Sequence, residues 1–234
     1  MWFHWRVFQQ RFPLKIISLM ARKGGVGRTT IATNLAVAFM ESGLRVGLID
    51  LDPLCSVTAW GEIRESEEPI VADAPMKNLG KFLEAGRRLK LDIMLLDTPS
   101  SGGIDVHEAV LLSNFVLIPC RAGYFDIRAI KLTTDIAKLV GKPYAVMFNA
   151  VSPRDDQVVI AVRDELRAAG DRVLDAIVHQ RTVLSASVAL GSSAIEQDPA
   201  GKAAEEIRSL RDELVILAKI QAGKHSHKYK VKAA

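Results

Sequence analysis

The stretch Lys23-Gly24-Gly25-Val26-Gly27-Arg28-Thr29-Thr30 decides the fold class of this chain. An apolar run at 14–20 precedes it, and a segment with helical periodicity at 29–40 follows it. A strand, a glycine-rich turn and a helix in this order are typical of a phosphate-binding loop. The glycines let successive backbone N–H groups face an anion, and the helix N-terminus adds its positive dipole end. We therefore predict that residues 24–30 bind the phosphates of a nucleotide, with the hydroxyl of Thr29 on Mg²⁺.

This loop departs in two places from the ordinary G-x-x-x-x-G-K-[ST] pattern. Arg22 replaces the first glycine and Arg28 replaces the lysine, while an extra lysine, Lys23, precedes the double glycine. The arrangement resembles the deviant Walker A box, K-G-G-x-G-K-[ST], of the ParA/MinD family of ATPases. The small plasmid-partition proteins of the ParA type look nearest, and the resemblance extends over residues 14–220.

Four further segments carry the resemblance, in the order in which the family has them. Residues 43–53, GLRVGLIDLDP, look like the second family motif, and residues 91–99, LDIMLLDTP, look like the Walker B strand. Residues 115–119 with the following Phe125-Asp126 resemble the next strand and its loop. His-Gln-Arg at 179–181 is similar to the C-terminal part of the small partition ATPases.

Strand and helix patterns alternate along the chain, which predicts an α/β fold: one domain with a mainly parallel, twisted sheet and helices on both faces. The apolar runs are continuous rather than alternating, as expected where both faces of a sheet are covered. The predicted strands are 15–21, 45–50, 70–72, 92–97, 114–119, 143–149 and 173–178. The predicted helices are 28–41, 76–90, 104–112, 127–140, 155–169 and 200–221.

Charge is uneven between the ends and the body of the chain. The net charge is +4, yet residues 1–13 hold two arginines and no acid, and the tail from Lys224 holds four lysines and no acid. We expect a disordered extension at 1–13, an ATPase domain at 14–223 and a disordered basic tail at 224–234. The alternative for the aromatic extension is an interfacial membrane anchor.

Several classes of protein do not fit the composition. The two cysteines, Cys55 and Cys120, have no metal-ligand spacing, so neither a zinc site nor a disulfide framework is indicated and a cytoplasmic location is expected. No apolar run reaches the 18 residues of a transmembrane helix, so we expect no stable membrane insertion. A hydrophobic content of 49% with 25% charged residues is ordinary for a globular domain.

Three aspartates follow predicted strands and are candidates for the chemistry of the site. Asp97 ends an apolar strand before Thr-Pro, where nucleotide hydrolases hold Mg²⁺, often through a water molecule. Asp50 and Asp52 share a face if the strand continues. The resemblance implies that Asp52 orients the attacking water and that Asp50 helps to organise the metal. The alternative for these residues is capping of a turn.

The resemblance also assigns roles to residues around the loop. Lys23 would reach the phosphates of a partner protomer in an ATP-dependent homodimer and take part in catalysis. Asn149 would contact adenine or simply cap its strand, and Asp126 would lie near the dimer face or cap a helix. Arg28 has a wide, planar guanidinium where the family has the slender side chain of lysine. ATP/ADP binding is expected because the backbone N–H groups of the loop remain, but weak hydrolysis is expected because the guanidinium would shift the γ-phosphate.

Relatives of this type bind DNA non-specifically in the ATP state through basic residues of the C-terminal half. The candidates in this chain are Arg154, Arg163, Arg167, Arg181 and Arg211, with Lys224, Lys228, Lys230 and Lys232 in the tail. A flexible basic tail can neutralise several phosphates, and it can equally bind anionic lipid.

The resemblance therefore predicts an ATP-dependent dimerising switch that segregates or positions DNA cargo, with nucleoid association and a ParB-like centromere-binding adaptor as partner. One alternative is a MinD-like positioning ATPase that acts on a membrane or on protein machinery. Another is a nucleotide-binding module whose hydrolysis is impaired by Arg28. A metabolic ligase that shares the loop has no further catalytic constellation to support it.

Overall fold

A computed structural model describes residues 13–100 and 104–221 and shows a seven-stranded parallel sheet. The strands are β1 (Lys15–Leu19), β2 (Val46–Asp50), β3 (Ile70–Asp73), β4 (Ile93–Asp97), β5 (Phe115–Cys120), β6 (Tyr144–Val151) and β7 (Val173–His179). They lie in the order β3-β2-β4-β1-β5-β6-β7. The chain therefore grows to one side of β1 first and then crosses to the other, which makes the carboxyl end of β1 the position where open α/β sheets bind ligands.

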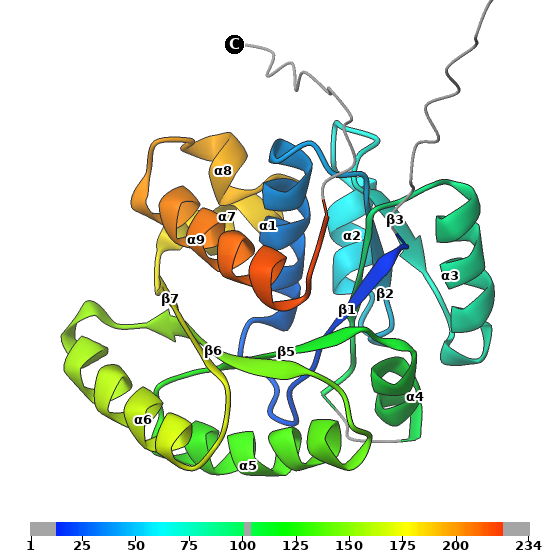
Figure 1. Cartoon of the computed structure of the whole chain (residues 1–234). Coiled ribbons are helices and arrows are strands. Elements are labelled where there is room, and N and C mark those ends of the chain that lie inside the picture. The colour runs from blue at the N-terminus through cyan, green and yellow to red at the C-terminus, as the bar shows by residue number, and fades with distance from the viewer. Residues whose placement is uncertain (1–12, 101–103, 222–234) are drawn as a thin grey trace, which may run out of the picture.

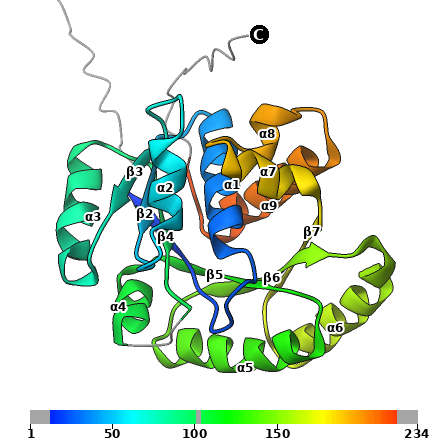
Figure 2. The same ribbon diagram turned by 180° about the vertical axis from the view of Figure 1, so that it is seen from behind.

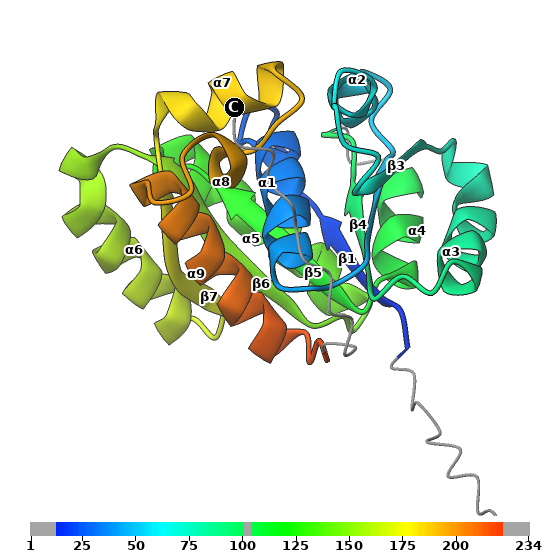
Figure 3. The same cartoon turned by 90° about the horizontal axis from the view of Figure 1, so that it is seen from above.

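Helices cover both faces of this sheet (Figure 1). They are α1 (Arg28–Glu41), α2 (Ser56–Glu62), α3 (Leu79–Arg88), α4 (Ile104–Leu112), α5 (Tyr124–Leu139), α6 (Asp156–Ala168), α7 (Thr182–Ala189), α8 (Ala194–Gln197) and α9 (Lys202–Leu217). Single turns of 3₁₀ helix, η1 (Met76–Asn78) and η2 (Pro153–Asp155), precede α3 and α6. Figures 2 and 3 show α1, α2, α7, α8 and α9 on one face and α3, α4, α5 and α6 on the other.

The core is divided between these two faces. On the first face, α1 is buried along most of its length, and its Leu35 and Phe39 pack with Leu210 and Leu214 of α9. The second face has two clusters, one beneath α3 and one beneath α4, α5 and α6. The central strands are buried at every position, as β4 illustrates, so continuous apolar runs were the correct signal for them.

The predicted fold class is confirmed, and each predicted strand and helix lies within a few residues of an observed one. Three short helices, α2, α7 and α8, were missed by the sequence analysis. None of the helices in the described ranges is long and apolar enough to cross a membrane.

Candidate functional site

The glycine loop connects the carboxyl end of β1 to α1. Gly25 and Gly27 have φ angles of +73° and +89°, a region that residues with a side chain rarely adopt. A Cβ atom on Gly27 would also collide with the amide of Asn149. Gly27 is the N-cap residue of α1 and provides no side-chain cap for the first turn. The helix thus presents uncapped backbone N–H groups and its positive dipole end at the loop, which is an anion-binding arrangement.

Asp97 lies directly behind this loop with a carboxylate that is only half satisfied. Its Oδ2 accepts a hydrogen bond of 2.6 Å from the hydroxyl of Thr29, whereas its buried Oδ1 has no hydrogen-bond partner. Burial raises the pKa of Asp97 to about 7, against the lowering effects of Thr29 and the positive charge of Arg28. An unsatisfied buried carboxylate oxygen beside a threonine hydroxyl fits a hard divalent cation such as Mg²⁺, which prefers oxygen ligands.

Asp50 lies opposite Asp97 in the register of the neighbouring strands β2 and β4. Unlike Asp97, it has a hydrogen-bond partner for each of its carboxylate oxygens. Oδ2 accepts hydrogen bonds from the backbone N–H groups of Val57 and Thr58 at 2.8 and 2.9 Å, and Oδ1 accepts one from that of Asp52 at 3.1 Å. Asp50 therefore caps α2 and fixes the connecting loop that carries Asp52. This is the turn-capping alternative of the sequence analysis, and a role beside the metal stays a prediction.

The Arg28 side chain points into the acidic group at the strand ends. Its Nη1 donates to the carbonyl of Ala21 at 2.9 Å, its Nη2 lies 3.3 Å from Oδ2 of Asp52, and its Nε lies 3.8 Å from Oδ1 of Asp97. Only 9% of the arginine side chain is exposed. Arg28 thus neutralises part of the acidic cluster and occupies Asp52, the residue that the resemblance assigns to the attacking water.

A second part of the site is a cavity of about 190 Å³ between the loop and the start of α7. This volume is below the roughly 300–1,000 Å³ of pockets that enclose a drug-sized ligand, so it suits one part of a nucleotide. Asn149 lines it and donates its amide to the carbonyl of Val26 at 2.8 Å, which ties the cavity to the loop. The other lining residues are Gly25, Val26, Gly27, Thr30, Arg121, Ala150, His179, Gln180, Arg181, Leu184 and Ser185.

A cluster around Glu206 of α9 supports the far wall of that cavity. One oxygen of Glu206 accepts from Nη2 of Arg181 at 2.6 Å and lies 2.8 Å from Nδ1 of His179. The other ring nitrogen of His179 lies 2.9 Å from Asp156. Although burial opposes it, the hydrogen bonds from Arg181 and His179 keep the pKa of Glu206 below its usual value. The cluster holds His179 and Arg181 in fixed positions at the cavity.

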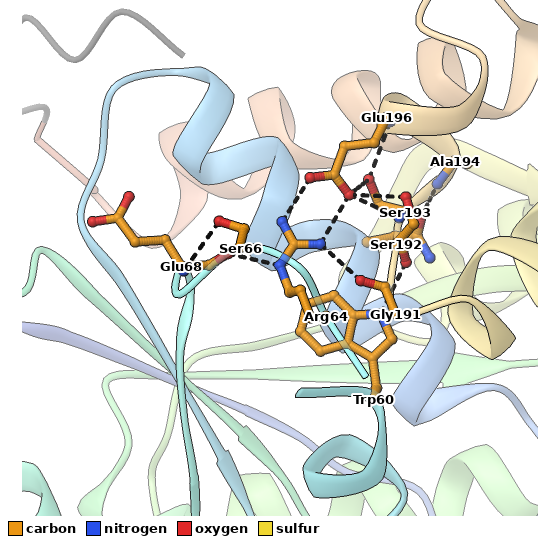
Figure 4. Close-up of polar contacts among 10 residues, drawn as sticks. Trp60, Arg64, Ser66, Glu68, Gly191, Ser192, Ser193, Ala194 and Glu196 are labelled. Carbon is orange, nitrogen blue, oxygen red and sulfur yellow. Dashed lines mark hydrogen bonds and ion pairs between the residues drawn. The ribbon is translucent and has the colours of Figure 1, made fainter. Parts of the chain in front are cut away.

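A polar clasp, formed by Trp60, Arg64 and Glu196, joins α2 to the α7–α8 turn (Figure 4). Arg64 makes two hydrogen bonds to the Glu196 carboxylate, at 2.6 and 3.0 Å, and lies 4.8 Å from the centre of the Trp60 ring. The Trp60 indole donates to the carbonyl of Ser192 at 2.9 Å. Sequence reasoning missed this clasp because its partners are far apart in the chain and follow no recognised spacing.

The arginines predicted to bind DNA are mostly engaged within the protein. Arg163 and Arg167 both pair with Asp175, Arg181 with Glu206, and Arg211 with Glu41 and Asp212. Among the residues that the structure describes, Arg154 is exposed and has no ion pair. Lys224, Lys228, Lys230 and Lys232 lie outside the described residues, as does the side chain of Asp126. Lys23 is exposed at the start of the loop.

Comparisons with known proteins identify the family and the fold. The family model for the CobQ/CobB/MinD/ParA nucleotide binding domain matches residues 17–194. The maintenance of carboxysome distribution protein A of Halothiobacillus neapolitanus is 28% identical over 217 residues, which cover 87% of this chain and 96% of that protein. The sporulation initiation inhibitor protein Soj of Bacillus subtilis is 23% identical, with 86% and 98% covered. The septum site-determining protein MinD of Pyrococcus horikoshii, complexed with Mg-ADP, has a TM-score of 0.70 at 20% identity, with 89% and 99% covered.

Proposed function

Because the chain belongs to the CobQ/CobB/MinD/ParA nucleotide-binding family, we propose that it is a ParA-type ATPase whose nucleotide state controls dimerisation and the positioning of a DNA cargo. The observation that carries this proposal is the convergence of four groups at the carboxyl edge of the sheet. These are the glycine loop, the Thr29–Asp97 pair, Asp52 and the cavity lined by Asn149.

In the proposed mechanism, the loop N–H groups and the α1 N-terminus bind the phosphates of ATP or ADP. Thr29 and Asp97 would hold Mg²⁺, Asp97 directly or through a water molecule. The metal supplies charge neutralisation at the phosphates when it is bound. Asn149 contacts the base from the cavity, and Asp52 orients water for the attack once Arg28 has left it for a phosphate oxygen.

Lys23 supports the dimeric part of the proposal. It is exposed and directly precedes the double glycine, so a second protomer can receive its ammonium group at its own phosphates. Light scattering with ATP and Mg²⁺ should show a dimer, and with ADP a monomer. Lys23→Ala should remove the dimer without changing the circular dichroism spectrum. A mass that is the same with ATP, with ADP and without nucleotide would refute the switch.

A second candidate is a positioning ATPase of the MinD kind that acts on a protein machine. The pairing of four of the five predicted DNA-binding arginines with carboxylates favours it, since Arg154 alone among them makes no ion pair in the described residues. The two candidates are separated by measuring ATP turnover with mixed-sequence DNA and, separately, with the protein encoded beside this chain. Stimulation by that protein alone would favour the protein cargo.

A further inference from the structure

The region around α3 carries a charge opposite to that of the rest of the described protein. The described ranges hold 25 basic residues and 27 acidic ones, because six of the 31 basic residues of the chain lie outside them. The segment 76–90 holds five basic residues and one acidic residue: Lys77, Lys81, Arg87, Arg88, Lys90 and Glu84. The rest of the described protein is therefore acidic, and α3 with its flanks is its basic surface.

Helical spacing places Lys81 and Arg88 on the outer face of α3, and the other three cations lie beside them in the segment 76–90. Leu79, Leu83 and Gly86 are buried beneath the helix, where Gly86 packs on Leu14 and Met94. Successive residues of a helix are rotated by about 100° about its axis. Lys81 and Arg88 therefore project on the side opposite to the buried residues, in line with Lys77 of η1. All five basic residues are exposed. Figure 3 shows α3 at the outer edge of the molecule, beyond β3 and away from α6.

The cations of this surface are available to a partner, in contrast to the arginines of α6 and α9. Within the described ranges, Lys77, Lys81 and Lys90 make no ion pair. Arg87 and Arg88 share Glu84 at 3.6 and 3.4 Å, with more than half of each arginine side chain exposed. Exposed pairs of this kind contribute only about 0–1 kcal/mol, so a phosphate can replace the carboxylate.

The shape of the surface also permits close approach. Gly80 and Ala85 flank the row of cations, and a Cβ atom on Gly80 would meet nothing within 4 Å. The ten residues of α3 span about 15 Å, which corresponds to roughly four phosphates along one strand of duplex DNA. The segment 76–90, with an excess of four positive charges, matches that density.

We propose that this surface, the α3 face formed by Lys77, Lys81, Arg87, Arg88 and Lys90, binds the phosphate backbone of duplex nucleic acid without requiring ATP or a second protomer. The inference goes beyond the proposed switch, in which DNA binding depends on the ATP dimer. Nucleic acid is favoured over lipid because a membrane-binding helix exposes bulky apolar residues beside its cations. In α3 the leucines Leu79 and Leu83 are buried in the core.

The test measures fluorescence anisotropy of a labelled, mixed-sequence 30-bp duplex with the full chain and ADP, from 50 to 200 mM KCl. Lys81→Gln with Arg88→Gln should weaken binding about tenfold or more and reduce the log–log salt slope by about 2, because each phosphate contact contributes about 0.9. Glu84→Gln should have the opposite effect and tighten binding. The matched control is Lys131→Gln with Lys202→Gln, which changes the net charge equally at exposed lysines of α5 and α9 and should leave affinity within about twofold.

Other results would overturn the inference. One is that the α3 pair and the control pair weaken binding equally. Another is that neutralisation of the four lysines at 224–232 removes all binding while the α3 pair has no effect. Sedimentation with phosphatidylserine vesicles that depends on α3, without duplex binding, would instead assign the surface to lipid. The proposed switch can fail separately from this inference. If the wild-type protein shows no ATP turnover or no ATP-dependent dimer but still binds DNA through α3, the switch is refuted and this inference stands.

Discussion

Replacement of Arg28 by lysine tests the main departure of the site from its family. The guanidinium is held by the Ala21 carbonyl at 2.9 Å and by Asp52 at 3.3 Å, and only 9% of the side chain is exposed. The ammonium of a lysine presents one compact point charge and cannot bridge these groups as a planar fork does. Arg28→Lys should therefore release Asp52 while keeping a positive charge in the loop.

The size of the effect follows from the contact that must be broken. A hydrogen bond to a charged group contributes about 1.5–3 kcal/mol, and each 1.36 kcal/mol in an activation free energy is tenfold in rate. If Asp52 has to leave Arg28 before it can orient water, the lysine variant should hydrolyse ATP about ten to a hundred times faster. Its free energy of unfolding should fall by a similar 1–3 kcal/mol, because the anchor at Ala21 is weakened.

The assay is phosphate release at saturating Mg²⁺ and ATP, in steady state and in a single turnover. Asp52→Ala in the lysine background should abolish the gain, whereas Arg172→Lys, at an exposed position before β7, serves as the matched control and should leave the rate unchanged. Equal rates for the wild type and Arg28→Lys would refute the reasoning, since they would mean that the Arg28–Asp52 contact does not limit the chemistry.

Three further variants test the electrostatics of the fold. Arg64→Ala should lower the free energy of unfolding by about 3 kcal/mol or more in urea, because the Arg64 side chain is buried and Glu196 loses its ion-pair partner; adding Glu196→Gln should restore part of the loss. Asp97→Asn should raise Tm in the absence of nucleotide more at pH 8 than at pH 5, since the pKa of Asp97 is raised to about 7 by burial and its ionised form is the costly one. A larger gain at pH 5 would contradict this. Glu41→Gln should lower Tm at pH 7, because the hydrogen bond from Arg208 lowers the pKa of Glu41; the effect should disappear as the pH falls through that lowered pKa and the carboxylate is protonated.

Much of the architecture could be predicted because it depends on local signals. The strands of a doubly covered parallel sheet are continuous apolar runs, and the glycine loop has a recognised order of strand, turn and helix. Once the sheet was predicted, Asp50 and Asp97 were expected at one edge, and the register pairs them directly. The sequence analysis could therefore place these two aspartates together at one edge of the sheet before any contact was known.

What it missed depends on contacts that follow no local sequence signal. Helix α2 begins after Cys55, which makes no side-chain cap; the cap is supplied by Asp50, seven residues before Val57. The pairing of Arg211 with Glu41 joins two helices that are separated by most of the chain. The resemblance suggested DNA-binding arginines in the C-terminal half, whereas each of Arg163, Arg181 and Arg211 has a carboxylate partner in the fold.

Satisfaction of buried polar groups distinguishes the clasp from the cluster at the glycine loop. In the clasp, every hydrogen-bonding group of Arg64 and Trp60 has a partner, so the cluster is complete as a structural joint. At the loop, Nε of Arg28 and Oδ1 of Asp97 are buried without hydrogen-bond partners, and they are two of the four such atoms in the described residues. Burying polar atoms without hydrogen-bond partners costs stability, and proteins retain such atoms where a ligand supplies the missing interaction. The unsatisfied buried atoms of Asp97 and Arg28 therefore favour a binding site at the loop. The satisfied hydrogen-bonding groups of the clasp favour a structural role for Arg64 and Glu196.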